Sequence, residues 1–150
     1  MDFKAFKILL AAEVVLLFIE FWLGVSINLF VSIPKLTPLN FSSYSGGSEV
    51  LAHITNGILV IALAALIVSY SIKLRSLLIS ALSVVALVFA VVASERGMEF
   101  ALVGHNYTLS LEMAISFLIV YTLYFIEFYV VERRSMQVET EEKTPSTDCL

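Results

Sequence analysis

The residues most able to do chemistry are polar side chains placed inside long apolar stretches. Glu13 and Glu20 are seven residues apart, two turns of a helix, so their carboxyl groups would share one face. An ionisable group that faces lipid is unfavourable, so this face should point into a bundle or at another subunit. Near mid-membrane Glu20 is expected to be a neutral acid. It would either hydrogen-bond to neighbouring helices, through Tyr121, Thr122 or Tyr124, or relay protons.

A second polar group lies at the start of another apolar run. The stretch SEVLAHITNG places Glu49, His53 and Asn56 at helical spacing. Counting residues from the centres of the apolar runs puts Asn28, His53 and Glu112 at one shared depth, about 12 Å toward the outside. A carboxylate beside an imidazole suits quinone binding, metal binding or proton transfer, and a hydrogen-bonded lock between helix ends is the alternative. Two protein ligands are too few for a tight metal site, so no metal is expected.

The two histidines of the chain, His53 and His105, raise a haem hypothesis. Both precede or begin an apolar run on the same side, where they could be the axial ligands of a b-type haem. The Glu49 to His53 spacing resembles part of the pattern of haem A synthase. The chain departs from that family because Ile54 stands where the family has Arg, and because it offers half the number of spans.

The amino-acid composition indicates whether these polar groups lie in a membrane or in a water-soluble domain. Of 150 residues, 59% are hydrophobic and only 15% are charged, and the mean hydropathy is +0.94. A soluble domain carries about a quarter charged residues. The sequence therefore predicts an integral membrane protein in contact with the lipid bilayer. No basic surface of the kind that binds nucleic acid is present.

Four apolar segments are each close to the ~20 residues that cross a bilayer as a helix. The predicted helices run from about 7 to 33, 50 to 72, 77 to 94 and 109 to 131. We therefore predict an all-α membrane protein, a bundle of four transmembrane helices within residues 1–135. Residues 34–48 and 95–108 would be loops, and the acidic tail 136–150 would be disordered.

Basic residues predict the orientation, because they are enriched in cytoplasmic loops. One side of the four-span arrangement carries Lys4, Lys7, Lys73, Arg75, Arg133 and Arg134, and the other only Lys35 and Arg96. Both termini are therefore predicted to be cytoplasmic in a multi-pass protein of the cell membrane. The sequons at Asn40 and Asn106 fall in the outer loops, where N-glycosylation is possible.

Short motifs spread over the membrane portion show a wider resemblance. GVSINLFVSIPKLTP, HITNG, GMEF and LSLEMAISFL resemble a family of small four-span membrane proteins of archaea and actinobacteria. The positions that carry the resemblance are Gly24, Asn28, Leu29, Phe30, Pro34, His53, Gly57, Gly97, Phe100, Ser110, Met113 and Ala114. The resemblance implies a four-span architecture in which His53 and Asn28 belong together, and it implies no particular activity.

Three functions fit these patterns. No phosphate-binding loop, nucleophile elbow or zinc-protease motif is present, so enzymatic activity is not expected. An accessory or structural subunit of a membrane complex, or a homo-oligomer, is the leading hypothesis. A redox component that binds haem b or quinone is the second, and it depends on His53 with Glu112 or His105. A small proton or ion transporter is the third, and it depends on Glu13, Glu20 and the cluster of Asn28, His53 and Glu112.

Overall fold

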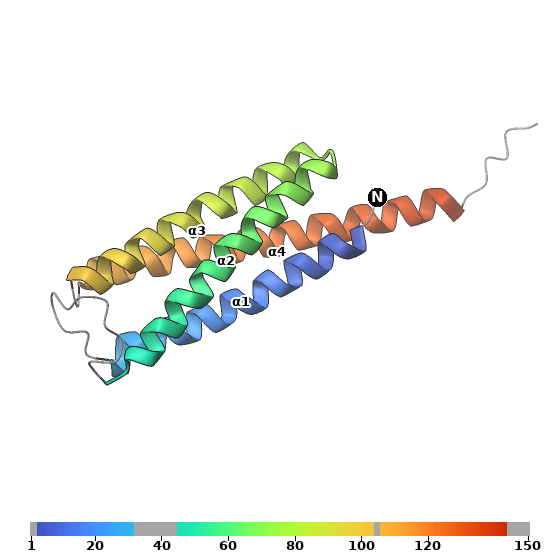
Figure 1. Cartoon of the computed structure of the whole chain (residues 1–150). Coiled ribbons are helices and arrows are strands. Elements are labelled where there is room, and N and C mark those ends of the chain that lie inside the picture. The colour runs from blue at the N-terminus through green and yellow to red at the C-terminus, as the bar shows by residue number, and fades with distance from the viewer. Residues whose placement is uncertain (1–2, 32–44, 104–105, 144–150) are drawn as a thin grey trace, which may run out of the picture.

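Four α-helices form a bundle in the computed structural model, which describes residues 3–31, 45–103 and 106–143 (Figure 1). They are α1 (Phe3–Phe30), α2 (Gly47–Lys73), α3 (Leu77–Val103) and α4 (Tyr107–Lys143). The helices alternate in direction, and each packs against its two neighbours in a ring. This confirms the predicted all-α four-helix bundle. We call the end of the bundle that carries the start of α1, the α2–α3 turn and the end of α4 the terminal end. The opposite end is called the loop end.

Two helices, α3 and α4, extend far past their predicted C-terminal ends. α3 continues to Val103 through a segment expected to be a loop, and α4 continues to Lys143 through the first part of the tail expected to be disordered. Once a span has formed a helix, each further residue adds a hydrogen bond at little extra entropic cost. In α3 the extension also gains an ion pair of i,i+3 spacing, in which Arg96 lies 2.8 Å from Glu99. Residues 144–150 lie outside the described residues.

Two of the helices have a short polar side chain as their N-cap. The Asn106 Oδ1 atom accepts a hydrogen bond from the backbone N–H of Thr108 at 3.0 Å, so Asn106 caps α4. Ser76 caps α3 through its bond with the N–H of Ile79. Glycosylation of Asn106 stays a prediction, and the other sequon, Asn40, lies outside the described residues.

Small side chains allow close packing in the middle of the bundle. Ala64, Ser83, Ala86 and Ala90 are all buried. Lipid tails are as apolar as leucine, so helices in a membrane associate through close van der Waals contact, which small residues permit. The helices can therefore bring polar side chains from opposite elements within hydrogen-bonding distance.

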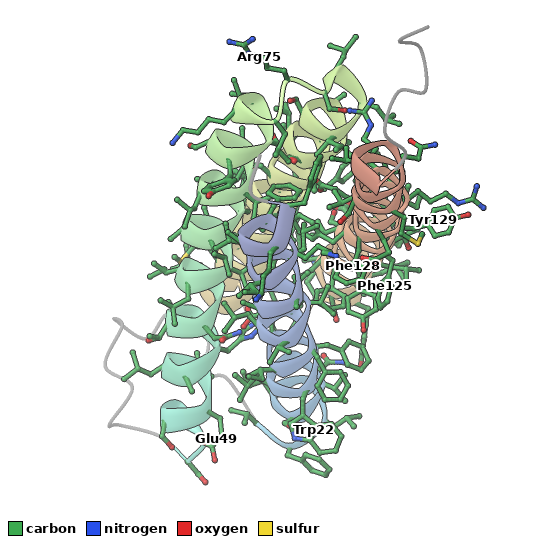
Figure 2. All side chains as sticks on the ribbon, turned by 90° about the vertical axis from the view of Figure 1, so that its right-hand side faces the viewer. Trp22, Glu49, Arg75, Phe125, Phe128 and Tyr129 are labelled. Carbon is green, nitrogen blue, oxygen red and sulfur yellow. The ribbon has the colours of Figure 1, made fainter. Side chains whose placement is uncertain are left out.

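Large apolar side chains cover the outside of the bundle. Trp22 is 65% exposed, and Phe125, Phe128 and Tyr129 point outward from α4 (Figure 2). All four helices are long and apolar enough to cross a membrane. Soluble proteins rarely expose so much contiguous apolar surface to water. This surface therefore suits contact with lipid tails.

Candidate functional site

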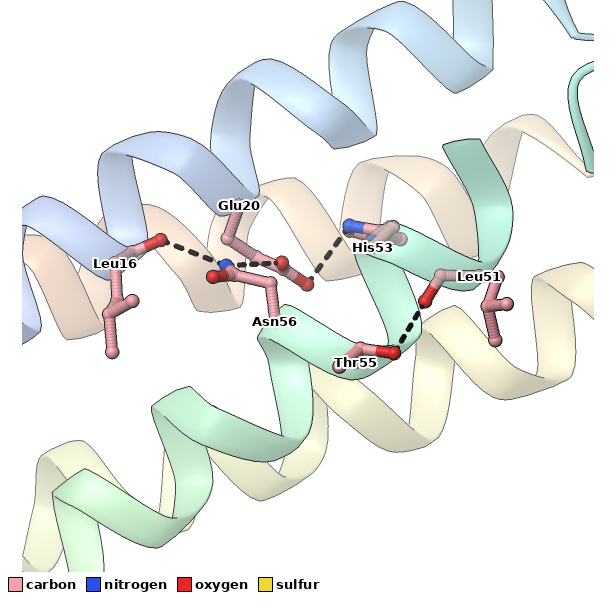
Figure 3. A network of polar contacts seen from close by, with 6 residues as sticks. All are labelled: Leu16, Glu20, Leu51, His53, Thr55 and Asn56. Atoms are coloured by element: carbon pink, nitrogen blue, oxygen red, sulfur yellow. Dashed lines mark hydrogen bonds and ion pairs between the residues drawn. The ribbon is translucent and has the colours of Figure 1, made fainter. Parts of the chain in front are cut away.

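A polar network joins α1 to α2 in the loop-end half of the bundle (Figure 3). The Asn56 side-chain amide donates to Glu20 Oε2 at 2.8 Å and to the backbone carbonyl of Leu16 at 3.0 Å. On the other carboxylate oxygen, His53 Nδ1 lies 3.0 Å from Glu20 Oε1. We refer to Glu20, His53 and Asn56 as the Glu20 network.

Helix geometry and two glycines make this network possible. His53 and Asn56 are three residues apart on α2, so they project from the same face toward α1. A Cβ atom on Gly57 would lie 3.0 Å from Glu20 Oε1, and one on Gly24 would lie 3.5 Å from His53 Cε1. Each glycine therefore leaves room for a polar side chain that comes from the opposite helix.

The network is largely shielded from the surroundings. The Glu20 and His53 side chains are 16% and 19% exposed, and Asn56 is buried. The His53 ring nitrogen is at ion-pair distance from the carboxylate, but its N–H bond is not directed at an oxygen closely enough for a regular hydrogen bond. Glu20 therefore holds the His53 ring against α1 by close contact.

A cavity of about 320 Å³ adjoins the network and is lined by residues of all four helices. Its lining is mainly apolar, and its polar members are Glu20, Asn28, His53, Ser94 and Ser110. Several apolar rim residues, such as Ile58 and Met98, are also exposed on the outside of the bundle, so the cavity is partly open there. The volume lies at the lower end of the ~300–1,000 Å³ typical of small-molecule sites.

The expected cluster of Asn28, His53 and Glu112 has a different arrangement in the structure. His53 contacts Glu20, and Asn28 lines the cavity, whereas Glu112 contacts the Arg96 side chain with Nε and Oε2 3.0 Å apart. Arg96 reaches Glu112 because α3 continues past the predicted end of its span. The sequence predicts Arg96 to lie in a loop, whereas it lies within α3.

The side chains expected near Glu20 from α4 also have other neighbours. Thr122 donates to the carbonyl of its own helix at Leu118, and Tyr121 stacks on Phe117 at a centroid distance of 6.0 Å. His105 lies outside the described residues, so the second histidine of the haem hypothesis has no structural description. Glu49 is exposed and accepts a hydrogen bond from Ser48 rather than approaching His53.

A second set of polar groups is buried closer to the terminal end. Glu13, Ser83, Tyr124 and Glu127 are all 0% exposed. Sequence reasoning named Glu13 but missed Glu127 as a site residue. The signal that would have found it is a glutamate inside the apolar run YFIEFYV. Asn56 was recognised at helical spacing from His53 but was not assigned to Glu20.

Within residues 3–31, 45–103 and 106–143, no group of three or more His, Cys, Asp or Glu side chains is placed to hold a metal ion. The polar groups of the bundle therefore meet in pairs and small networks among those residues.

The fold defines the class: a multi-pass integral membrane protein whose four helices line a cavity. No protein-family model matches the sequence, and no curated protein or solved structure matches it either. The function must therefore be inferred from the site.

Proposed function

We propose that the protein binds a small lipid-soluble molecule that carries a carbonyl or hydroxyl group, of the quinone class, in the cavity beside the Glu20 network. The observation that carries the proposal is an apolar cavity with one convergent polar pair, Glu20 and His53, on its wall. Apolar walls with a few placed polar groups are the usual composition of a small-molecule site. Its partly open rim suits a ligand that enters from the lipid.

The imidazole suits both redox forms of such a ligand. With a proton on Nδ1, beside the Glu20 carboxylate, the neutral ring of His53 presents Nε2 as an acceptor for a hydroxyl group. When the ring is charged, Nε2 becomes a donor to a carbonyl oxygen. Gly24 leaves this edge of the ring open, since even a Cβ atom there would be 3.9 Å from Nε2.

The resemblance to small four-span proteins of archaea and actinobacteria is consistent with the proposal. Most of the positions that carry it line the cavity, and these are Gly24, Asn28, His53, Gly57, Gly97, Phe100, Ser110, Met113 and Ala114. The leading hypothesis from the sequence is an accessory subunit of a membrane complex. The present proposal makes that hypothesis more specific, because such a subunit would bind a ligand. The haem alternative depends on His105 and is tested alongside.

Titration of the purified protein in detergent with a short-chain ubiquinone analogue tests the proposal. Trp22 is the only tryptophan and is close to Gly24 along α1, so its fluorescence reports binding. We expect saturable quenching. A hydrogen bond to a charged group contributes about 1.5–3 kcal/mol, so His53→Ala should weaken binding roughly ten- to hundredfold. Gly24→Leu should abolish the saturable component by filling the cavity.

Two outcomes would contradict quinone binding. Quenching that rises linearly with concentration and is equal in His53→Ala would show only collision with the exposed tryptophan. A Soret absorption band in the purified protein that disappears in His53→Ala would show that the site holds haem. Ser69→Ala is the matched control, because Ser69 is exposed on α2 away from the cavity and should leave binding unchanged.

We also propose that the protein lies in the cell membrane with both termini in the cytoplasm, which places the cavity in the outer half. Cys149 is the only cysteine and tests this directly. A membrane-impermeant maleimide should label it only after cells are permeabilised. Ser45, exposed at the loop end, gives the control: Ser45→Cys in a Cys149→Ser background should be labelled in intact cells. The reverse pattern would invert the topology.

A further inference from the structure

The buried polar groups of the terminal half have no role in the cavity. Both carboxyl oxygens of Glu13, the Tyr124 hydroxyl and Glu127 Oε2 have no hydrogen-bond partner among the described residues. Tyr124 and Glu127 are one turn apart on α4, and Glu13 is buried on α1, which packs against α4. Unpartnered polar atoms are costly inside an apolar bundle, so they indicate a bound species that supplies hydrogen bonds.

The contacts of Ser83 indicate what this species is. The Ser83 Oγ atom lies 3.0 Å from the carbonyl oxygen of Ile79 and is also in close hydrogen-bond contact with Glu127 Oε1. A hydroxyl group has a single hydrogen, so it cannot donate to both oxygens. Both contacts are hydrogen bonds at the same time when Glu127 carries a proton and donates it to Ser83, which then donates to Ile79.

We propose that Glu13 and Glu127, together with Ser83 and Tyr124, form a proton-exchange site inside the terminal half of the bundle. A proton on either glutamate converts an acceptor-only carboxylate into a donor for its neighbours. A second proton would do the same for the other glutamate. Protonation also removes the charge that is unfavourable in an apolar interior, and it does not depend on a ligand in the cavity.

The charged and titratable neighbours from the other faces have partners of their own. Lys7 pairs with Glu132 at 2.9 Å, Tyr70 of α2 stacks on Phe6 and lies under Lys73, and Glu20 contacts His53. From α3, residues 77–94 contribute no titratable side chain. No cation from these neighbours therefore neutralises Glu13 or Glu127.

An apolar layer separates this site from the Glu20 network. Leu17, Val60 and Val120 are buried and line the inner limit of the cavity. Leu17 lies between Glu13 and Glu20 along α1, and those two carboxyl groups are about 10 Å apart along the helix axis. The two polar sites are therefore distinct.

Labelling with dicyclohexylcarbodiimide tests the proposal, because this apolar reagent reaches the bundle through lipid and adds to protonated carboxyl groups. We expect mass spectrometry of the full chain in vesicles to find the adduct on Glu13 or Glu127, with labelling that decreases as the pH is raised. Glu13→Gln/Glu127→Gln should lose it. Glu132→Gln is the control, since the partly exposed Glu132 pairs with Lys7 and its replacement should leave labelling unchanged.

Stability gives a second readout that does not depend on the reagent. A folded state that holds protons which the unfolded chain releases becomes less stable as the pH rises. The wild-type protein should therefore show a falling unfolding midpoint, and the double variant should not. Glu127→Gln should fold, because its amide can donate to Ser83 as the protonated acid does. Three results would each overturn the proposal. They are absence of carbodiimide labelling at every pH, an unfolding midpoint with the same pH dependence in the double variant, and labelling that sodium ions but not potassium ions prevent, which would indicate a sodium site.

Discussion

Replacing Gly46 with alanine is expected to destabilise the bundle strongly. Gly46 precedes α2 with a φ angle of 87°, in the left-handed region. A side chain in that region costs about 1–2 kcal/mol. The added Cβ atom would also lie 2.6 Å from Val31 Cγ2, inside a cluster of Ile27, Val31 and Val50, and such overpacking costs about 1–3 kcal/mol more. The loss should appear as a lower unfolding midpoint in a sodium dodecyl sulfate titration followed by helicity.

Two further variants separate the contributions to this effect. Gly46→Ala combined with Val31→Ala removes the steric clash but keeps the strained φ angle, so it should recover part of the loss. Gly24→Ala should have the opposite sign, because Gly24 is helical, has room for a methyl group and gains up to ~1 kcal/mol of helix propensity. If Gly46→Ala were as stable as the wild type, the positive φ angle of Gly46 and its close contact with Val31 would both be contradicted.

The second large effect is expected at Glu20. Glu20→Ala leaves His53 without its partner and removes one of the two acceptors of Asn56. An unsatisfied buried polar group costs about 1–3 kcal/mol, so the loss in unfolding free energy should be roughly 2–4 kcal/mol. The same variant should weaken binding of the quinone analogue, because the imidazole is no longer held in place.

The matched control is Glu20→Gln, which keeps the size and can still bond both neighbours. Its oxygen can accept from Asn56, and its amide can donate to a His53 ring with the proton moved to Nε2. We expect a loss below about 1 kcal/mol, within the range of one ordinary hydrogen bond. A double-mutant cycle of Glu20→Ala and Asn56→Ala should be non-additive. Additive losses would show that the network does not act as a unit.

The architecture could be predicted from the sequence because the membrane restricts the choice. Long apolar runs must satisfy their own backbone hydrogen bonds, and among them four reach the length of a span. The helix ends were harder to predict. Glu95 to Val103 and Met136 to Lys143 contain good helix formers next to a helix that has already formed, so the helix continues past the apolar run. Hydropathy reports where lipid begins and not where the helix ends.

The sequence predicts individual residues of the site but not which of them contact one another. The sequence predicts that His53 and Glu20 both face the bundle, but it places them in different clusters. Depth counting assumes that the centres of all apolar runs lie at one level, whereas in the structure His53 lies level with Glu20. α1 and α2 are close together at the loop end and diverge toward the terminal end (Figure 1). The cavity itself has no sequence signature, because it is lined by residues of all four helices. Gly24 and Gly57 indicate close helix approach, but their opposite residues are visible only in three dimensions.

The layer formed by Leu17, Val60 and Val120 has an electrical consequence. A membrane that maintains a voltage needs insulation wherever charge enters it, and this layer supplies such insulation inside the bundle. Charge on Glu20 or His53 on one side of it, and on Glu13 or Glu127 on the other, cannot pass between the two sites while these side chains keep their packing. The Glu20 network and the site of Glu13 and Glu127 can therefore hold charge within one bundle without conducting it from one site to the other.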